Sequence, residues 1–474
     1  MSTRDRDQVP RAAHSALSDA RPAVFWTDRP DAPDPAPPLS GTAHADLAIV
    51  GGGLTGLWAA LLAREADPAA EVVLLEADRV ASGASGRNGG FVAASLTHGL
   101  AHGLSMWPDE MATLLRLGRE NLAAIGAFIE AQSIEADFRT CGKTTVAVQP
   151  HHLGELSDAY RLFEAHGEEV ELLDADAMRA DIASPTYLGG LRIRSGYALV
   201  DPARLCWGLA GAARASGARL HERTRVRGLE RTRDGVSLIT QDGRIDARRA
   251  IIATSAFPPP LRRLRHWVLP VYDHVLMTEP LSARQLVSVG WPERQGITDA
   301  GNRFHYYRLT ADDRILWGGY DAVYHFGNRV HPSLEQRDAS HETLARHFFE
   351  TFPQLEGLRF SHRWAGAIDS TSRFTPVFGT AFGGRVSYAL GYTGLGVGSS
   401  RFGAQVALDL VDGRRTEQTG LGMVRRRPFP FPPEPLRWIA VRVTQSELAR
   451  QDSSGGRRGL WLRLLDHLGM GFAS

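Results

Sequence analysis

Cysteine, lysine and long apolar runs are scarce in this chain of 474 residues. Cys141 and Cys206 are its two cysteines, too few for a disulfide framework or a cysteine metal cluster, which favours a reducing, cytoplasmic location. Lysine occurs once, as Lys143, so arginine supplies almost all of the positive charge. No apolar run is long enough to span a bilayer.

An excess of charge of either sign is also missing. Lys plus Arg number 54 and Asp plus Glu 53, so net charge gives no support for nucleic-acid binding. The hydrophobic content of 43% and charged content of 23% are typical of a globular protein with a large core. No metal-ligand pattern stands out, and we expect no metal site.

A glycine turn between a strand and a helix is the most informative motif. The apolar run 47–50 leads into Gly51, Gly53 and Gly56, which fill the pattern G-x-G-x-x-G, and residues 57–63 continue as an apolar helix. Such glycines allow the tight turn, the approach of a pyrophosphate and the packing of helix on strand. A second predicted strand, 71–76, ends in Glu76, at the spacing where a carboxylate binds a ribose with a free 2′-hydroxyl. NAD or FAD is therefore favoured over NADP, against the alternative of a βαβ unit without a ligand.

Two further glycine-rich segments extend this prediction. Residues 80–91 hold small residues that let the backbone lie flat against a planar ligand, or else form a flexible loop. Residues 391–398 precede a helix predicted from about 399 to 412, with Gly413 as its C′ residue. The amides and positive dipole at the start of that helix would stabilise negative charge on a reduced flavin.

Together, the glycine motif, Glu76 and the run 85–90 resemble FAD-dependent oxidoreductases of the D-amino-acid oxidase superfamily, in particular the γ-glutamylputrescine oxidoreductase-like branch. The resemblance implies an α/β fold in which a discontinuous Rossmann-type FAD domain alternates with an α+β substrate domain on a mixed antiparallel sheet. We expect an extended arm (1–45), FAD-domain parts (46–100, 196–260, 361–424), a mixed helical and substrate segment (101–195), a substrate domain (261–360) and a tail with a terminal helix (425–474).

The cofactor contacts follow from these motifs and from the resemblance. The residues expected to bind FAD are Gly51, Gly53, Leu54, Thr55, Gly56, Glu76, Ser85, Gly86, Arg87, Asn88, Gly89, Gly90, Val226, Ala253, Thr254, Ser255, Thr393, Gly394, Leu395, Gly396 and Val397. The resemblance alone implies the roles of Val226 and 253–255, for which plain sheet is the alternative. Some relatives attach FAD through a cysteine near residues 364–376, where this chain has none, so we expect non-covalent FAD.

The substrate wall is predicted from the strands around residue 308. Resembled amino-acid oxidases carry a carboxylate-binding arginine at about the place of Arg308, although a salt-bridged surface arginine is an open alternative. Tyr307 and Tyr320 are the aromatic neighbours expected beside it. Lys143 cannot be aligned with the lysine that promotes oxygen reactivity in related oxidases, and we expect a surface or structural role for it.

The predicted activity is oxidation of an amine or amino acid. Hydride would pass from the carbon bearing nitrogen to flavin N5, water would hydrolyse the imine, and O2 would reoxidise the flavin to give H2O2. Alternatives are a dehydrogenase that uses a quinone or other carrier, a flavin monooxygenase and a non-catalytic flavin-binding partner. Leucines of the terminal helix, 460–468, could lie on a membrane or a partner, but we expect them to cover the protein's own body.

Overall fold

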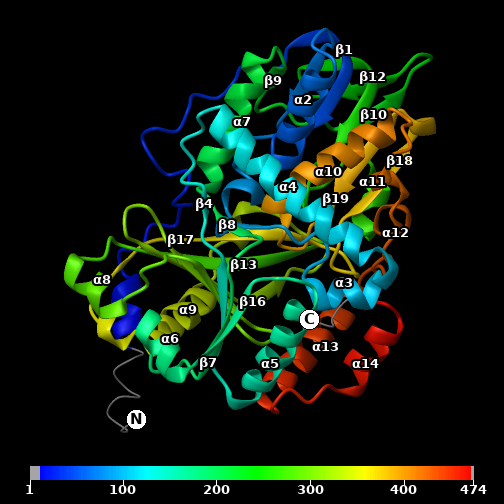
Figure 1. Ribbon diagram of the computed structural model, residues 1–474. Coiled ribbons are helices and arrows are strands. Elements are labelled where there is room, and N and C mark those ends of the chain that lie inside the picture. The colour runs from blue at the N-terminus through cyan, green and yellow to red at the C-terminus, as the bar shows by residue number, and fades with distance from the viewer. Residues whose placement is uncertain (1–10, 471–474) are drawn as a thin grey trace.

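Two large sheets, packed one above the other in Figure 1, organise the chain. The structure, a computed structural model, describes residues 11–470. The first sheet has the strand order β10-β11-β12-β1-β2-β9, and β19 and β18 extend it from β12. Its strands are β1 (Gly41–Val50), β2 (Val72–Leu75), β9 (Arg219–His221), β10 (Gly228–Arg231), β11 (Val236–Ile239), β12 (Gly243–Ile252), β18 (Val377–Ala381) and β19 (Val386–Leu390).

The centre of this first sheet is parallel. β1 pairs in parallel with β2 and β12, and β19 pairs in parallel with β12. The end of β1, Leu47–Val50, is apolar and buried because helices cover the sheet there. Those helices include α2 (Leu54–Ala66), α4 (Met111–Ala131), α7 (Pro202–Ala215) and α10 (Gly396–Val411).

The second sheet has the order β17-β13-β16-β15-β14-β5-β7-β6 and is antiparallel except where β14 meets β5. Its strands are β5 (Lys143–Ala147), β6 (Val170–Asp174), β7 (Gly189–Ile193), β13 (Leu269–Thr278), β14 (Gly296–Asp299), β15 (His305–Leu309), β16 (Ile315–Tyr324) and β17 (Phe360–Ser370). Helix α9 (Asp338–Thr351) packs on one face. The opposite face, called here the inner face, contributes Val275, Leu316 and Trp364 to the core shared with the first sheet.

The chain passes repeatedly between the two sheets. Strands of the first sheet come from residues 41–75, 219–252 and 377–390, and strands of the second lie between them. This confirms the predicted fold class, a discontinuous Rossmann-type domain interleaved with an α+β domain. A small sheet of β3 (Phe91–Ala93), β8 (Tyr197–Leu199) and β4 (Arg139–Thr140) connects them. The other helices are α3 (Leu100–Met106), α5 (Pro150–Ala165), α6 (Ala175–Asp181), α8 (Ala283–Val289), α11 (Glu417–Gly420) and α12 (Gly422–Arg425).

The N-terminal arm differs from the expected extended segment. Residues 11–17 are helical, β1 begins already at Gly41, and the first ten residues of the predicted arm lie outside the described residues. Trp26 is 2% exposed and its Nε1 donates to the Asn88 carbonyl at 2.9 Å. The amide of Leu39 donates to Thr224 Oγ1 at 3.0 Å. The arm is thus bound to the segments that surround the predicted cofactor site.

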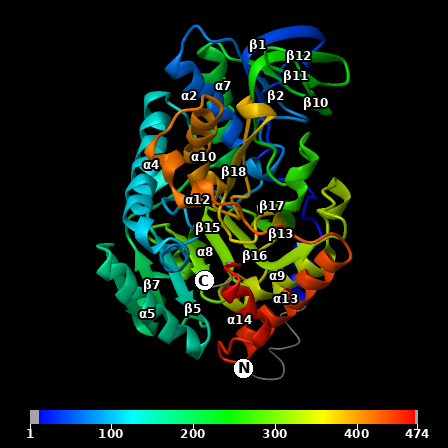
Figure 2. The ribbon, with the colours of Figure 1, turned by 90° about the vertical axis from the view of Figure 1, so that its right-hand side faces the viewer.

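The C-terminal tail forms two helices, α13 (Leu436–Ser453) and α14 (Leu460–His467), at the lower edge of the molecule in Figure 2. The expectation for α14 is only half right. Leu462 and Leu465 are buried, whereas Leu460, Leu464 and Leu468 are exposed, because the helix presents a second apolar stripe outward. Between residues 11 and 470, no helix combines the length and the apolar composition needed to cross a membrane.

Candidate functional site

The glycine turn lies where β1 ends and α2 begins. Gly51 has φ +113°, and a Cβ there would collide with the carbonyl oxygen of Ala253 on the neighbouring strand. Gly53 is the N-cap of α2 and has no side chain to satisfy the first amides of the helix. The turn therefore leaves a helix N-terminus open to a phosphate.

Glu76 closes the other side of this turn. Its Oε2 accepts from the Gly52 amide at 2.6 Å, and its Oε1 accepts from the Asp78 amide at 2.9 Å. Desolvation beside the loop raises the pKa of Glu76, while these two amides oppose that rise. The carboxylate stands at the end of β2, as the sequence predicts for a ribose ligand.

The loop at residues 82–91 is held by its own side chains. Asn88 donates to the carbonyls of Ala84 and Ser85 at 3.0 and 2.9 Å and accepts from the Gly90 amide at 2.8 Å. Arg87 donates to Glu335 of the second domain at 2.5 Å. These bonds fix the loop and occupy the side chains of Asn88 and Arg87.

Ser85 links this loop to the glycine turn. Its Oγ accepts from the Leu54 amide, in the first turn of α2, at 3.0 Å. The end of β12 meets the same place, since Ala253 to Ser255 follow β12 and a Cβ at Gly51 would collide with the Ala253 carbonyl. Val226, before β10, lies in the buried cluster that includes Val50 and Leu75. Thr254 Oγ1 is buried there without a hydrogen-bond partner in the described part of the chain. A buried hydroxyl left unpaired next to an open helix N-terminus indicates a ligand.

The last segment predicted to bind the cofactor is the loop 391–395 before α10. Gly391, Thr393 and Gly394 all have positive φ, at +81°, +49° and +88°. Asp369 at the end of β17 accepts from the Gly391 amide at 2.6 Å, and burial raises the pKa of this carboxyl to about 6. Gly396 and Val397 begin α10, so the N-terminus of a second helix lies at the end of this loop.

The inner face of the second sheet stands opposite these loops. Tyr306 on β15 donates to the carboxylate of Asp273 on β13, and its ring lies against Gly89 and Gly318, where a Cβ would come within 2.7 and 2.6 Å of it. Burial raises the pKa of Asp273 to about 7. The side chains of Tyr306 and Asp273 are partly exposed, whereas the residues before and after them in the strands are buried. The inner face is therefore accessible at these two side chains.

Lys143, the chain's single lysine, was expected to have a surface or structural role, and it lies on the same inner face. In β5 it is paired with Gly296 of β14, and its Nζ lies 5.1 Å from the ring centre of Tyr197. No hydrogen bond or ion pair holds it within residues 11–470, and desolvation lowers its pKa to about 8. One feature of the sequence points to this residue, namely that lysine occurs nowhere else in the chain.

His98 connects Lys143 to the loop before α10. Its ring lies 5.2 Å from that of Phe374 and is hydrogen-bonded to the backbone of Thr393. Desolvation, then the charges of His102 and Lys143, lower the pKa of His98 to about 4, so its imidazole is neutral at pH 7. Sequence reasoning missed His98 because its φ of +59° places it in a turn without a recognisable motif.

The predicted substrate residues do not converge. Tyr307 points to the α9 face, where its hydroxyl is 2.7 Å from that of Tyr187, and Tyr320 stacks on His305 at 5.3 Å. Arg308 is on the inner side but is 0% exposed and donates to the Val200 carbonyl at 2.7 Å. Strand alternation explains the difference, because Tyr306, and not Tyr307, faces the gap. The site described below therefore uses none of these three predicted residues.

These features define the class of the protein as a dinucleotide-binding flavoprotein. They are the open N-terminus of α2, the acid at the end of β2, and a second glycine loop before α10 with the inner face of the second sheet opposite. The family described as FAD dependent oxidoreductase matches residues 46–410, and the chain belongs to this family. It is therefore an FAD-dependent oxidoreductase, and the unpaired Thr254 hydroxyl and the glycine cradles fit FAD as its cofactor.

Individual relatives agree with this assignment. The chain is 32% identical over 402 residues to γ-glutamylputrescine oxidoreductase of Escherichia coli (strain K12), covering 83% of this chain and 89% of the relative. It is 28% identical over 390 residues to a probable oxidoreductase of Haemophilus influenzae, covering 80% and 85%. The structure of glycine oxidase from Geobacillus kaustophilus is similar in fold, with a TM-score of 0.67, 22% identity and coverage of 79% and 96%.

Proposed function

We propose that the protein oxidises the terminal amine of a polyamine-type substrate such as γ-glutamylputrescine. Two findings support this substrate class: the similarity to γ-glutamylputrescine oxidoreductase and a site that is equipped for an amine. Bound FAD supplies the hydride acceptor for the carbon that carries nitrogen. The resulting imine is hydrolysed by water to an aldehyde and ammonia.

The observation that carries the proposal is the position of Lys143. Of the 54 lysine and arginine side chains, 53 are arginines, which stay protonated. The one lysine, Lys143, lies on the inner face of the second sheet. A lysine with a pKa of about 8 can lose its proton within the physiological range. We infer that the reaction requires a side chain at this position that can lose its proton.

Lys143 and its neighbours then prepare the amine. An ammonium has no lone pair to support hydride loss, so the substrate must first give up a proton. In the proposed step Lys143 Nζ accepts that proton. Neutral His98 adds no repelling charge, and the rings of Phe374 and Tyr197 exclude water from the reacting carbon.

An amine is favoured over an α-amino acid because the nearby guanidinium groups are occupied. Arg308 is bound to Val200 and Asp137, and Arg87 is bound to Glu335. A carboxylate next to the reacting carbon would lack the bidentate partner that arginine gives. The sequence predicted an amine or an amino acid as the substrate, and these contacts argue against the amino acid.

A substrate panel tests the proposal. Purified holoenzyme is given γ-glutamylputrescine, putrescine, glycine and D-alanine, and ammonia release is measured with O2 and, separately, with a redox dye. We expect turnover of γ-glutamylputrescine above the other three. Peroxide formation would identify O2 as the acceptor, and dye-dependent turnover alone would identify a carrier. Turnover of glycine or D-alanine in preference to both amines would contradict the amine assignment.

A further inference from the structure

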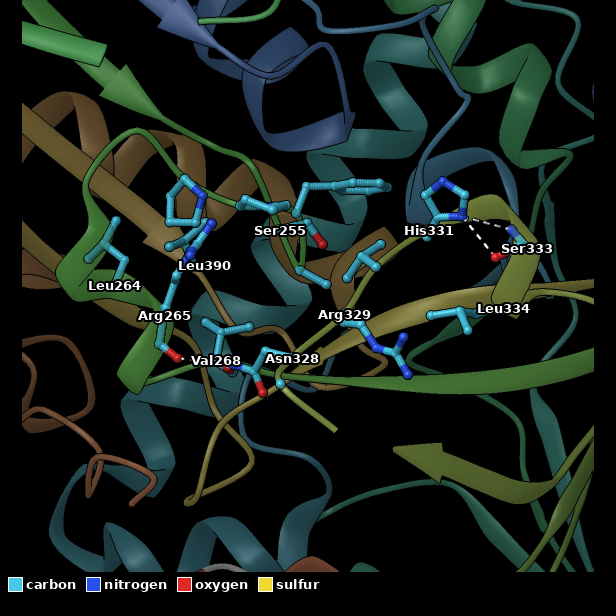
Figure 3. A pocket seen from close by; sticks show the side chains of 16 residues that line it. Ser255, Leu264, Arg265, Val268, Asn328, Arg329, His331, Ser333, Leu334 and Leu390 are labelled. Carbon is cyan, nitrogen blue, oxygen red and sulfur yellow. Dashed lines mark hydrogen bonds between the residues drawn. The ribbon is translucent and has the colours of Figure 1, made fainter. Parts of the chain in front are cut away.

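A separate cavity of about 480 Å³ lies between the two domains (Figure 3). From the first domain it is lined by Ser255, Phe257 and Leu390, and from the second by Arg329, His331 and Leu334. None of Lys143, His98, Tyr197 or Tyr306 lines it. It is therefore not the chamber in which we place the amine.

The cavity borders two cofactor segments. Ser255 follows Thr254, the residue with the unpaired buried hydroxyl, and Leu390 directly precedes Gly391. Asp369 joins them, since it accepts from the Gly391 amide and from the Ser255 side chain. A molecule in this cavity would thus lie beside the loops assigned to FAD, and Lys143 does not line the cavity.

The lining selects against a cationic amine and for a molecule with an apolar body and oxygen acceptors. Apolar side chains form much of the wall, namely Phe257, Leu264, Val268, Leu334, Leu390 and two prolines, and Ser255, Asn328, His331 and Ser333 add hydrogen-bonding groups. No carboxylate lines the cavity, so a cationic amine would find no counter-charge there. Arg265 and Arg329 also line the cavity, and their guanidinium groups donate hydrogen bonds to electron-rich oxygens.

We propose that this cavity binds a planar, apolar electron acceptor of the quinone class. The proposal rests on the proposed function only in that the enzyme must pass on the electrons it takes from an amine. Two electrons and two protons leave the reduced cofactor, the quinone becomes a hydroquinone, and the cofactor returns to its oxidised form. Arg329 positions a quinone oxygen, and the walls hold the ring.

Reoxidation without any amine provides the test. Holoenzyme is reduced anaerobically with dithionite and mixed with menadione or, in parallel, with O2, while flavin absorbance is followed. Leu334→Trp places an indole in the cavity, and we expect it to slow reoxidation by menadione by about tenfold or more while leaving O2 reoxidation within about twofold. Val287→Trp, at a position that is 84% exposed on α8, is the matched control and should change neither rate.

A binding readout accompanies the rates. Menadione added to oxidised holoenzyme should perturb the flavin absorption band with a saturable dependence, which Leu334→Trp removes and Arg329→Gln weakens. Equal effects of Leu334→Trp on menadione and O2, no effect on either, or loss of FAD from the variant would overturn the proposal. Failure of every amine to reduce the flavin, with these quinone results as expected, would instead contradict the proposed amine function alone.

Discussion

The Nζ of Lys143 lies 5.1 Å from the centre of the Tyr197 ring, and no carboxylate is paired with it in residues 11–470. The contact joins β5 of the second sheet to β8 of the small connecting sheet. An aromatic ring attracts a cation but, unlike a carboxylate, does not hold the lysine in its charged form. The burial of Lys143 therefore decides its pKa. This relationship makes the single lysine the group through which pH should control the reaction.

Activity should therefore rise with pH through the titration of Lys143. Burial lowers its pKa from 10.5 to about 8, so the neutral amine predominates above pH 8. We expect kcat/KM for the amine substrate to increase with an inflection near that value. In Lys143→Met the inflection should vanish and kcat/KM should fall roughly a hundredfold or more. An inflection that persists near pH 8 in the methionine variant would assign it to another group.

Stability separates this role of Lys143 from a structural one. Because its pKa is lowered in the folded state, the unfolded chain binds more protons between about pH 8 and 10.5, and the protonated lysine destabilises the fold at neutral pH. Lys143→Met should be at least as stable as the native protein at pH 7. Lys143→Arg, whose charge is permanent, should be inactive at every pH. A large loss of stability in Lys143→Met would show that the lysine supports the fold.

Gly53→Val should abolish FAD binding. A Cβ at Gly53 would lie 2.8 Å from Ser85 Oγ, and the rest of the valine would extend into the space left for the pyrophosphate. Flavin content after purification and FAD titration of the apoprotein measure the effect. Gly211→Val is the control, because a Cβ at Gly211 meets nothing within 4 Å. Stoichiometric flavin in Gly53→Val would mean that the pyrophosphate lies elsewhere.

Glu76→Ala should weaken FAD binding without unfolding the protein. The carboxylate is placed to exchange its bond with Gly52 for bonds to ribose hydroxyls. Losing a charge-assisted hydrogen bond costs on the order of 1.5–3 kcal/mol, which is roughly a ten- to hundredfold rise in Kd. FAD titration and circular dichroism measure the two properties, with Glu230→Ala, an exposed acid in the same sheet, as control. An unchanged Kd would remove Glu76 from the cofactor site.

Flavin should be released intact when the holoenzyme is precipitated with acid. The segment 364–376 has no cysteine, and Cys206 is buried with its sulfur 3.8 Å from the Ser85 carbonyl. Absorbance of the supernatant and pellet decides the matter. Flavin that stays with the protein pellet would show a covalent bond.

Arg308→Ala should reduce stability rather than substrate affinity. The guanidinium is buried, and this burial lowers its pKa to about 10 in spite of the nearby Asp137. Its removal would leave the Val200 carbonyl unpaired and a void beside Trp26, a loss on the order of 3 kcal/mol. Urea denaturation and the KM for the amine distinguish the outcomes. A rise in KM with unchanged stability would restore Arg308 to the substrate wall.

The fold could be predicted to a large extent because its signals are local. The end of β1, the start of α7 at Asp201 and Pro202, and Gly413 after α10 all have the capping or turn residues that mark element ends. The arm was harder to predict, because its placement depends on single contacts such as that of Trp26 with Asn88, far apart in the chain.

The substrate side could not be predicted in the same way. In β15, one residue of strand register decides whether Tyr306 or Tyr307 lies on the inner face of the sheet. A strand with aromatic residues at both positions gives no sign of its orientation. Lys143 and His98 come together only through the pairing of distant strands and the turn before α3. Among the residues predicted to bind the cofactor, in contrast, those of the first glycine turn and Glu76 follow a sequence motif with a fixed spacing.

Anaerobic reduction of the bound flavin tests the central claim most directly. Holoenzyme is mixed with γ-glutamylputrescine without an electron acceptor, and the oxidised flavin band is followed over time. We predict complete bleaching, faster at pH 9 than at pH 7, and strongly slowed in Lys143→Met. A flavin that remains oxidised with every amine of the panel, yet is reduced by dithionite, would contradict the assignment of this protein as an amine-oxidising enzyme.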